Sequence, residues 1–180
     1  MKLLAISGSL RRHSYNRMLL DAAAGTCAQM VHYVAWRGLA DIPPYTEDLV
    51  ETPVAVTEFR RQIACAEAVL IATPEYNGSI PGALKNALDW ASRPFPDNCL
   101  RGKPAAVIGA STGMFGARFA QAELRKVLKT IGATVLDAEL PVAAADNAFT
   151  ASGRLRDREV AEALCSIVSE LLERSLRAAA

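Results

Sequence analysis

Three short stretches of the chain combine residue types that can bind a ligand, and the first is SGSLRRHSYN at residues 7–16. Its hydroxyl groups, amide and arginines come just before a predicted helix. A helix N-terminus presents free backbone N–H groups, and hydroxyls and an arginine beside it complete a site for an anion. Gly8 allows close approach of the backbone. The stretch therefore predicts a phosphate site, and a capped strand-to-helix turn with solvated arginines is the alternative.

The glycine spacing in this first stretch argues against the two common nucleotide-binding loops. A P-loop needs GxxxxGK[ST], and the stretch has no Gly-Lys pair. A dinucleotide-binding loop needs GxGxxG and an acidic residue at the end of the second strand. Gly8 has no partner glycine, and the second predicted strand reads HYVAW. A monophosphate held by serine, arginine and backbone amides fits the stretch better.

The second stretch is PEYNGSIPG at residues 74–82, directly after the apolar run AVLIAT. Tyr76 and Asn77 stand beside Gly78, and Gly82 follows, so aromatic and amide groups lie next to exposed main chain. Such a surface suits a flat heteroaromatic ring, whose polar edge bonds to peptide groups while a side chain packs on its face. The alternative is a helix-entry turn with a buried tyrosine.

The third stretch, GASTGMFGARFAQ at residues 109–121, contains a match to the GxSxG motif of α/β-hydrolases. In that fold an acid and a histidine follow the serine, but no histidine follows His32 in this chain. A serine without a base is a weak nucleophile. We therefore favour the interpretation that Ser111, Thr112 and Gly113 donate hydrogen bonds to the other edge of the same ring.

The elements around these stretches predict how they are positioned. Apolar runs predict strands at residues 2–7, 30–36, 68–73, 104–110 and 133–140. Amphipathic patterns predict helices at residues 14–28, 53–66, 80–92, 115–131 and 155–177. The alternation indicates a single α/β domain over residues 1–180, with a five-stranded parallel sheet in the flavodoxin-like order 2-1-3-4-5. The three stretches then follow strands 1, 3 and 4 and meet at one edge.

Composition limits the class of partner. The 180 residues carry 20 basic and 19 acidic side chains, a net charge of +1, which gives no electrostatic case for nucleic acid or an anionic membrane. The chain has no signal peptide and no apolar run long enough to span a membrane, so we expect a cytoplasmic protein. The loop at residues 38–53 is long enough to border a site or a subunit interface. The cysteines lack metal-ligand spacing, so we expect no metal and free thiols, with Cys27, Cys65 and Cys165 packed on helix faces.

Taken together, the stretches resemble the NADPH-dependent FMN reductase family, a flavodoxin-like group that includes chromate, quinone and azo-dye reductases. The matching segments are GSLRRHSYN, PEYNGSIPGALKNALDW and GMFGARFAQAELRKVL, and the resemblance covers most of residues 1–140. It implies non-covalent FMN, NADPH or NADH as electron donor, and a small-molecule acceptor such as a quinone, an azo compound, chromate or free flavin. Gly78 stands where some members carry an aromatic residue, which leaves the substrate preference open.

The resemblance also implies roles for individual residues and an assembly. The implied cofactor-binding residues are Ser9, Arg11, Ser14 and Asn16 at the phosphate with Tyr15 beside them, Pro74, Glu75, Tyr76, Asn77 and Gly78 along the ring, and Ser111 and Gly113 at its pyrimidine side. No catalytic side chain is expected, because the flavin carries the chemistry, and Glu75 is expected to contribute main chain only. The implied assembly is a homodimer or homotetramer with the third helix, which holds Asp89 and Trp90, in the dimer contact. Lys85 and Asp89 also form a simple i,i+4 pair.

The implied mechanism is a ping-pong cycle in which NAD(P)H passes hydride to flavin N5 and an acceptor then takes two electrons at the same face. Backbone donors of the third stretch would stabilise charge near N1. Arg12, Arg93 and Arg118 are candidates to meet the 2′-phosphate of NADPH. The alternatives are an electron carrier like flavodoxin, whose usual strong acidity this chain lacks, and a flavin-binding sensor without turnover.

Overall fold

The computed structural model describes residues 1–27 and 30–178. Its elements in chain order are β1 (Lys2–Ser7), α1 (Tyr15–Ala24), β2 (His32–Trp36), the 3-10 helix η1 (Gly38–Asp41), α2 (Val54–Ala64), β3 (Ala68–Thr73), α3 (Gly82–Ala91), β4 (Pro104–Ala110), α4 (Arg118–Ile131), β5 (Thr134–Val135), β6 (Pro141–Val142) and α5 (Arg158–Ala178). None of the helices in these residues is long and apolar enough to cross a membrane.

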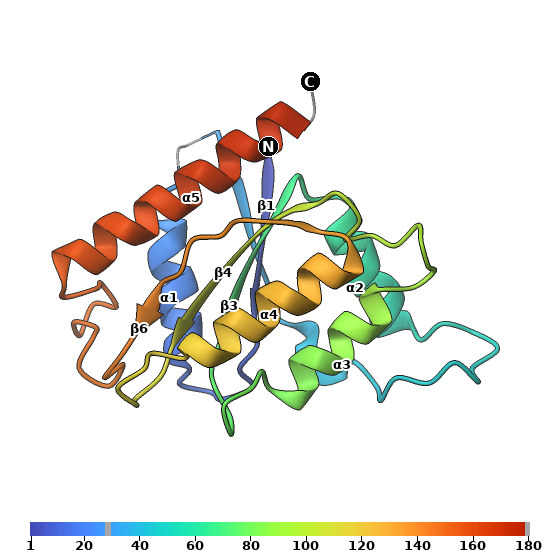
Figure 1. Ribbon diagram of the computed structural model, residues 1–180, viewed down its shortest axis with the longest axis horizontal. Coiled ribbons are helices and arrows are strands. Elements are labelled where there is room, and N and C mark those ends of the chain that lie inside the picture. The colour runs from blue at the N-terminus through green and yellow to red at the C-terminus, as the bar shows by residue number, and fades with distance from the viewer. Residues whose placement is uncertain (28–29, 179–180) are drawn as a thin grey trace.

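The sheet confirms the predicted flavodoxin-like order. Its strands run β2-β1-β3-β4-β5, each pairing is parallel, and β6 also pairs with β4. Helices α1 and α5 pack on one face, and α2, α3 and α4 pack on the other (Figure 1). Because β1 has β2 on one side and β3 on the other, the direction of winding changes beside β1, and a crevice is expected there at the carboxyl ends of the strands.

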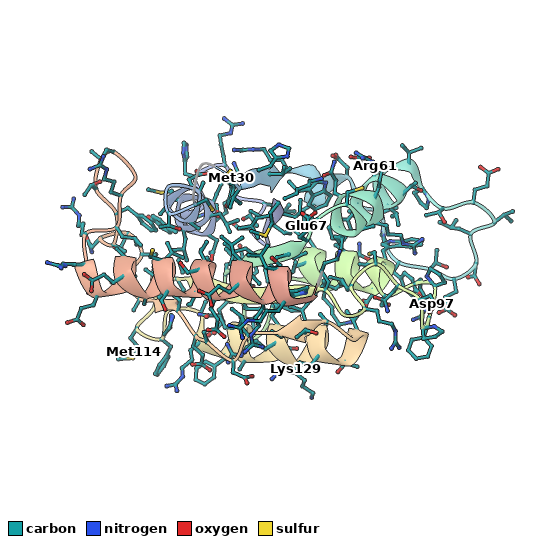
Figure 2. All side chains as sticks on the ribbon, turned by 90° about the horizontal axis from the view of Figure 1, so that it is seen from above. Met30, Arg61, Glu67, Asp97, Met114 and Lys129 are labelled. Atoms are coloured by element: carbon teal, nitrogen blue, oxygen red, sulfur yellow. The ribbon has the colours of Figure 1, made fainter. Side chains whose placement is uncertain are left out.

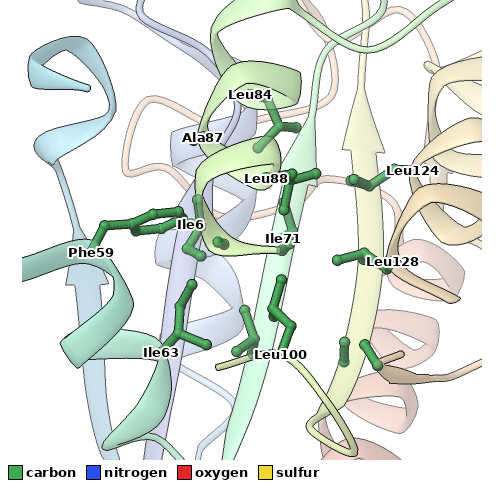
Figure 3. Close-up of a cluster of buried hydrophobic side chains, with 14 of the residues drawn as sticks. Ile6, Phe59, Ile63, Ile71, Leu84, Ala87, Leu88, Leu100, Leu124 and Leu128 are labelled. Atoms are coloured by element: carbon green, nitrogen blue, oxygen red, sulfur yellow. The ribbon is translucent and has the colours of Figure 1, made fainter. Parts of the chain in front are cut away.

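The two central strands are buried along their whole length, which explains their continuous apolar runs. On the face covered by α2, α3 and α4, Ile6 and Ile71 of the sheet pack with Phe59, Leu88 and Leu124 of the helices (Figure 3). The opposite face holds a second cluster of buried side chains around α1 and α5, which includes Leu3, Leu19, Leu70, Ile108, Leu164 and Leu171. The sheet is therefore fixed between two apolar layers, and polar groups gather only at its edges.

The predicted fifth strand is divided in two by residues 136–140. Leu136 donates its N–H to the carbonyl of Ala105 at 2.8 Å, and the carbonyl of Leu140 accepts from the N–H of Gly109 at 3.2 Å. Between these points the chain leaves the ladder, and two acidic side chains in the break pair with α4, Asp137 with Lys129 at 2.7 Å and Glu139 with Arg125. The prediction of one continuous strand over residues 133–140 was therefore wrong.

Gln121 of α4 holds the broken strand in place. Its side chain is fully buried, its Oε1 accepts the N–H of Leu140 at 3.1 Å, and its Nε2 donates to the carbonyls of Leu140 and Gly116, each at 3.2 Å. One amide thus pairs the N–H of Leu140, which the interrupted ladder leaves without a partner, and also ties the carbonyl of Gly116 in the third loop to the same strand.

Helix α1 is shorter than the predicted 14–28. It ends at Ala24, and Gly25 follows as its C-cap. The N–H of Gly25 bonds to the carbonyl of Ala22, and the N–H of Thr26 bonds to the carbonyl of Ala23. Residue 28 of the predicted helix lies outside the described residues. The turn that begins at Gly25 therefore ends the helix before the predicted last residues.

Two of the cysteines lie on the surface, so their predicted packing was wrong. Cys65 is exposed at the C-terminal end of α2, and Cys165 is exposed on α5. Cys27 and Cys99 are half-buried, and burial raises the pKa of the Cys99 thiol to about 11. All four are free thiols.

Helix α3 is only partly available as a contact surface. Lys85 and Asp89 form the predicted i,i+4 pair at 2.7 Å on its exposed side. Trp90 is only 5% exposed and donates its indole N–H to the carbonyl of Pro43 at 2.8 Å, while its ring meets Tyr45 edge-on at 4.9 Å. Trp90 therefore presents little surface to a partner, because its ring anchors the projecting loop between η1 and α2 (Figure 1). The dimer contact through α3 stays a prediction.

We predict that Gln121→Leu lowers the free energy of unfolding by about 1–3 kcal/mol, because it leaves the buried N–H of Leu140 and the buried carbonyl of Gly116 unpaired. Urea denaturation of the flavin-free protein measures the change. Lys126→Ala, at an exposed position of the same helix, should stay within about 0.5 kcal/mol of the parent. Equal unfolding midpoints for Gln121→Leu and the parent protein would contradict the role assigned to the amide.

Candidate active site

The loops after β1, β3 and β4 meet at one edge of the sheet, the lower edge in Figure 1. Together they line one pocket, which we call the three-loop pocket. Its lining residues are Ser9, Arg11, Ser14, Tyr15 and Asn16 from the first loop, Pro74, Glu75 and Tyr76 from the second, and Ala110, Ser111 and Thr112 from the third. The structure thus brings together all the predicted site residues except Asn77, Gly78 and Gly113.

The first loop offers hydroxyl groups and unpaired amides. Ser9 and Ser14 are 4% and 2% exposed, and the Ser14 hydroxyl caps α1 by accepting the N–H of Arg17 at 3.3 Å. The N–H groups of Tyr15 and Asn16 belong to the first turn, where a helix supplies no acceptor, and they donate to no group of the described chain. These amides and the positive end of the helix dipole form a site for an anion.

Arg11 adds a full positive charge to this cradle. Its guanidinium carbon lies 5.8 Å from the centre of the Tyr15 ring, which is a cation–π distance. The Tyr15 ring is stacked on Phe149 at 6.4 Å, so the arginine rests on an aromatic pair that the fold already holds. Arg11 has no carboxylate partner within the described ranges. Its charge is therefore available to a ligand.

Asn16 serves the structure with its side chain. Its Nδ2 donates to the carbonyl of Ala110, and its Oδ1 accepts the N–H of Ala110, both at 2.9 Å. This buried pair ties the first turn of α1 to the end of β4. The amide side chain is thereby occupied, and what Asn16 offers the pocket is its backbone N–H.

The second loop is a tight hairpin. Tyr76 and Ser79 exchange backbone hydrogen bonds at 3.0 and 3.1 Å, and the two residues between them, Asn77 and Gly78, have φ values of 55° and 74°. Positive φ at both central residues defines a type I′ turn, for which Asn-Gly is a preferred sequence. A Cβ on Gly78 would meet nothing within 4 Å. The glycine is needed for the positive φ of the turn. Its predicted place beside a ring stays a prediction.

Glu75 has a structural role that the sequence did not reveal. Its carboxylate accepts the N–H of Ala120 at 3.0 Å, in the first turn of α4. Helix α4 lacks a cap of its own, because Ala117 at its N-cap offers no side-chain acceptor. A carboxylate at a helix N-terminus is favourable for both hydrogen bonding and the dipole. Glu75 thus joins the second loop to the third, and the expectation that it contributes main chain alone was incomplete.

In the third loop, the hydroxyl of Ser111 bonds to the backbone of the loop itself. The Ser111 Oγ accepts the N–H of Gly113 at 3.0 Å, and the Ser111 N–H donates to the carbonyl of Val142 at 3.0 Å. His13 is exposed in the first loop, and His32 begins β2 at the sheet edge, so neither lines the pocket. The GxSxG match therefore has no base. The N–H groups of Ser111 and Gly113 are occupied by the protein itself, so of the three predicted donors only Thr112 keeps a free N–H in the described residues. The N–H of Thr112 donates to no group of the described chain.

An apolar rim next to the third loop was not anticipated. Met114, Phe115 and Phe119 are 80%, 54% and 50% exposed, and the two phenylalanine rings meet edge-on at 5.4 Å. Met114 lies at the outer surface of the molecule (Figure 2). Across the pocket Tyr76 is 48% exposed. The signal in the sequence was the aromatic pair Phe115 and Phe119, spaced i,i+4 at the start of the helix predicted over residues 115–131.

These features define a class of protein. A parallel sheet in the order 2-1-3-4-5, with free helix N-terminal amides and an arginine after β1 and a tight turn after β3 beside one pocket, is the arrangement of flavodoxin-like flavin-binding proteins. The chain belongs to the NADPH-dependent FMN reductase family, whose model matches residues 1–147. It is therefore an oxidoreductase that depends on FMN and NAD(P)H.

Individual relatives agree with this assignment. The chain is 46% identical over 165 residues to an NAD(P)H-dependent FMN reductase of Pseudomonas aeruginosa, which covers 90% of this chain and 88% of the relative. It is 43% identical over 128 residues to a 2-hydroxy-1,4-benzoquinone reductase of a Burkholderia species, covering 71% and 69% of the two chains. Among solved structures it is similar to FerB, a flavoenzyme NAD(P)H:(acceptor) oxidoreductase from Paracoccus denitrificans, with a TM-score of 0.86, 34% identity and coverage of 98% and 97%.

The type I′ turn predicts effects of different size for two substitutions at Gly78. Gly78→Val should lower the free energy of unfolding of the flavin-free protein by about 1–2 kcal/mol, because a β-branched residue is strained at positive φ. Gly78→Asn should cost much less, since asparagine tolerates this conformation. Urea denaturation of both variants tests the prediction, and an equal loss for valine and asparagine would point to side-chain crowding instead.

The cap made by Glu75 predicts that Glu75→Ala lowers the stability of the flavin-free protein by about 1 kcal/mol. Glu75→Gln keeps an oxygen that can accept the Ala120 N–H and should recover most of the loss. The amount of FMN bound at saturation should be the same in both variants. A stability loss as large for glutamine as for alanine would show that the charge, and not the hydrogen bond, matters.

Proposed function

We propose that the protein is an NAD(P)H:acceptor oxidoreductase that holds FMN non-covalently in the three-loop pocket and reduces quinones by two-electron transfer. Azo compounds, chromate and free flavin are further acceptors of the same proposal. The observation that carries it is the convergence of three loops, one with free helix N-terminal amides and an arginine, on one pocket at the switch point of the sheet.

The residues present fit FMN, beginning with its phosphate. The free N–H groups of Tyr15 and Asn16, the hydroxyls of Ser9 and Ser14 and the guanidinium of Arg11 supply hydrogen bonds and charge for a phosphate monoester. Charge-assisted hydrogen bonds of this kind are among the stronger polar interactions in proteins. A phosphate would also give a hydrogen-bond partner to the N–H groups of Tyr15 and Asn16, which have none in the described chain.

The other two loops fit the flavin ring. Pro74, Glu75 and Tyr76 form one wall, largely through main chain, and the N–H of Thr112 is free on the other. We expect the turn residues Asn77 and Gly78 to shape this wall, and Ser111 and Gly113 to position the donors at the pyrimidine edge. Donors at that edge stabilise the negative charge that develops there on reduction.

When bound, FMN would supply the redox chemistry, taking two electrons from NAD(P)H in one half-reaction and passing them to an acceptor in the other. The nicotinamide leaves oxidised. A quinone gains two electrons and two protons, one proton from the hydride and one from water, and leaves as the quinol. The chain contributes position and electrostatics, and no side chain of the pocket is assigned as nucleophile or base.

The surface around the pocket supports two further parts of the proposal. The apolar rim of Met114, Phe115 and Phe119 suits a flat aromatic acceptor. Exposed apolar side chains also favour a homodimer or homotetramer. Other exposed apolar residues lie on the projecting loop before α2, where Val50 is fully exposed and Leu49 is 48% exposed.

Arg11→Ala tests the phosphate cradle. It should raise the FMN dissociation constant at least tenfold, because a charged hydrogen bond contributes about 1.5–3 kcal/mol. His13→Ala, an exposed change in the same loop outside the pocket lining, should leave the constant unchanged. Fluorescence titration of the flavin-free protein with FMN measures both.

Steady-state oxidation of NADPH and NADH by the flavin-loaded protein, with quinone, azo and chromate acceptors, tests the reaction. Parallel lines in double-reciprocal plots would support the ping-pong order. Protein that binds FMN but leaves both nucleotides untouched would favour an electron carrier or a sensor.

A further inference from the structure

A second hollow lies on the other side of the first loop, between α1 and the segment from β2 to η1. Its floor includes Ala5 and Ala35, which are register partners of β1 and β2. Helix α1 packs over β1, β3 and β4, so the edge strand β2 stays partly uncovered and Ala35 is exposed. Small side chains on an uncovered part of the sheet leave a space of about 120 Å³. That is room for about four water molecules, a suitable size for one compact polar group.

Two arginines from separate elements line this hollow. Arg17 comes from the first turn of α1, and Arg37 follows β2. Neither forms an ion pair with any carboxylate in the described part of the chain, although Asp21 lines the same hollow. Within residues 1–27 and 30–178, the one hydrogen bond of the Arg17 guanidinium is a long one of 3.4 Å to the carbonyl of Arg12. Two guanidinium groups and one carboxylate leave a net positive charge.

The position of Arg17 in the first turn of α1 is electrostatically unfavourable when no anion is bound. Positive charge in the first turn of a helix opposes the helix dipole and costs about 0.3–1 kcal/mol. The first turn of α1 has no acidic residue to offset it. An anion in the hollow would remove this cost, whereas a solvated role for Arg17 leaves it in place.

The hollow is next to the proposed FMN phosphate cradle but separate from it. Ser9 lines both sites, Arg11 lines only the cradle, and Arg17 and Arg37 line only the hollow. Leu10 lies on the rim of the hollow and is 55% exposed, which offers an apolar surface to a base attached to the anion. Of the arginines first considered for the 2′-phosphate, Arg93 is paired with Glu47 at 2.9 Å and Arg118 with Glu139 at 3.4 Å.

We propose that the hollow between α1 and β2 binds a phosphate monoester, and that in turnover this group is the 2′-phosphate of NADPH, held by Arg17 and Arg37. The proposal rests on the proposed function, because it names the nucleotide that the enzyme prefers. NADH lacks the 2′-phosphate and leaves both guanidinium groups without an anion. Asp21 opposes the phosphate charge and limits the affinity.

Steady-state kinetics of the flavin-loaded protein with NADPH and NADH test the proposal. Arg37→Ala and Arg17→Ala should each raise the KM for NADPH about tenfold, the loss of a charged hydrogen bond, with kcat unchanged because neither residue touches the reacting atoms. The KM for NADH should stay the same. Asp21→Asn should lower the KM for NADPH, and Arg154→Ala, an exposed arginine of equal charge before α5, should change neither constant.

Calorimetric titration with 2′-AMP, adenosine and inorganic phosphate gives a readout that does not need turnover. We expect 2′-AMP to bind more tightly than adenosine, and Arg37→Ala to abolish the difference. If 2′-AMP or phosphate binds through Arg37 while the ratio of NADPH to NADH turnover is the same in Arg37→Ala, the hollow binds free phosphate and the coenzyme assignment is wrong. Equal binding of 2′-AMP and adenosine overturns the anion site itself. A protein that oxidises neither nucleotide refutes the proposed function, and the 2′-AMP titration still decides the site.

Discussion

The paired hydrogen bonds between the Asn16 amide and the backbone of Ala110 are the link on which the carboxyl edge of the sheet depends. Strands β1 and β4 are not neighbours, because β3 lies between them. The loops that follow β1 and β4 are held together only if a group reaches across the end of β3. Asn16 does so from the first turn of α1, in a buried setting where an unpaired amide would be costly. The bond therefore sets the distance between the phosphate cradle and the third loop.

Two other polar side chains complete this framework. Glu75 joins the second loop to the first turn of α4, and Gln121 of the same helix closes the gap between β5 and β6. Each replaces a backbone partner that the local chain does not supply. Because these side chains are occupied by the protein, the groups left for a ligand are mostly backbone N–H groups. Asn16, Glu75 and Gln121 thus matter chiefly for placing main chain. An inventory of reactive residue types overlooks this role.

The fold was predictable because its signals are local. Continuous apolar runs mark β3 and β4, and 3.6-residue periodicity marks the helices, so the strand order followed from the alternation. The location of the site followed in turn, since loops after β1, β3 and β4 must share an edge. The break at residues 136–140 was not predictable, because it depends on Gln121, which is distant in sequence and looks like any polar residue of an amphipathic helix. The cap from Glu75 was hidden for the same reason. The burial of Trp90 was not predictable either, because it depends on the long loop that packs over it.

Charge at the amino end of α1 connects folding with binding. The helix begins at a cradle with Arg11 and carries Arg17 in its first turn, and no acidic residue stands there to balance its dipole. The fold thus concentrates positive potential where most helices place carboxylates. A ligand that binds only the folded state stabilises it, and here an anion also relieves a cost that the flavin-free protein carries. The positive charge that costs stability at this end of α1 is the same charge that the proposed phosphate sites would use.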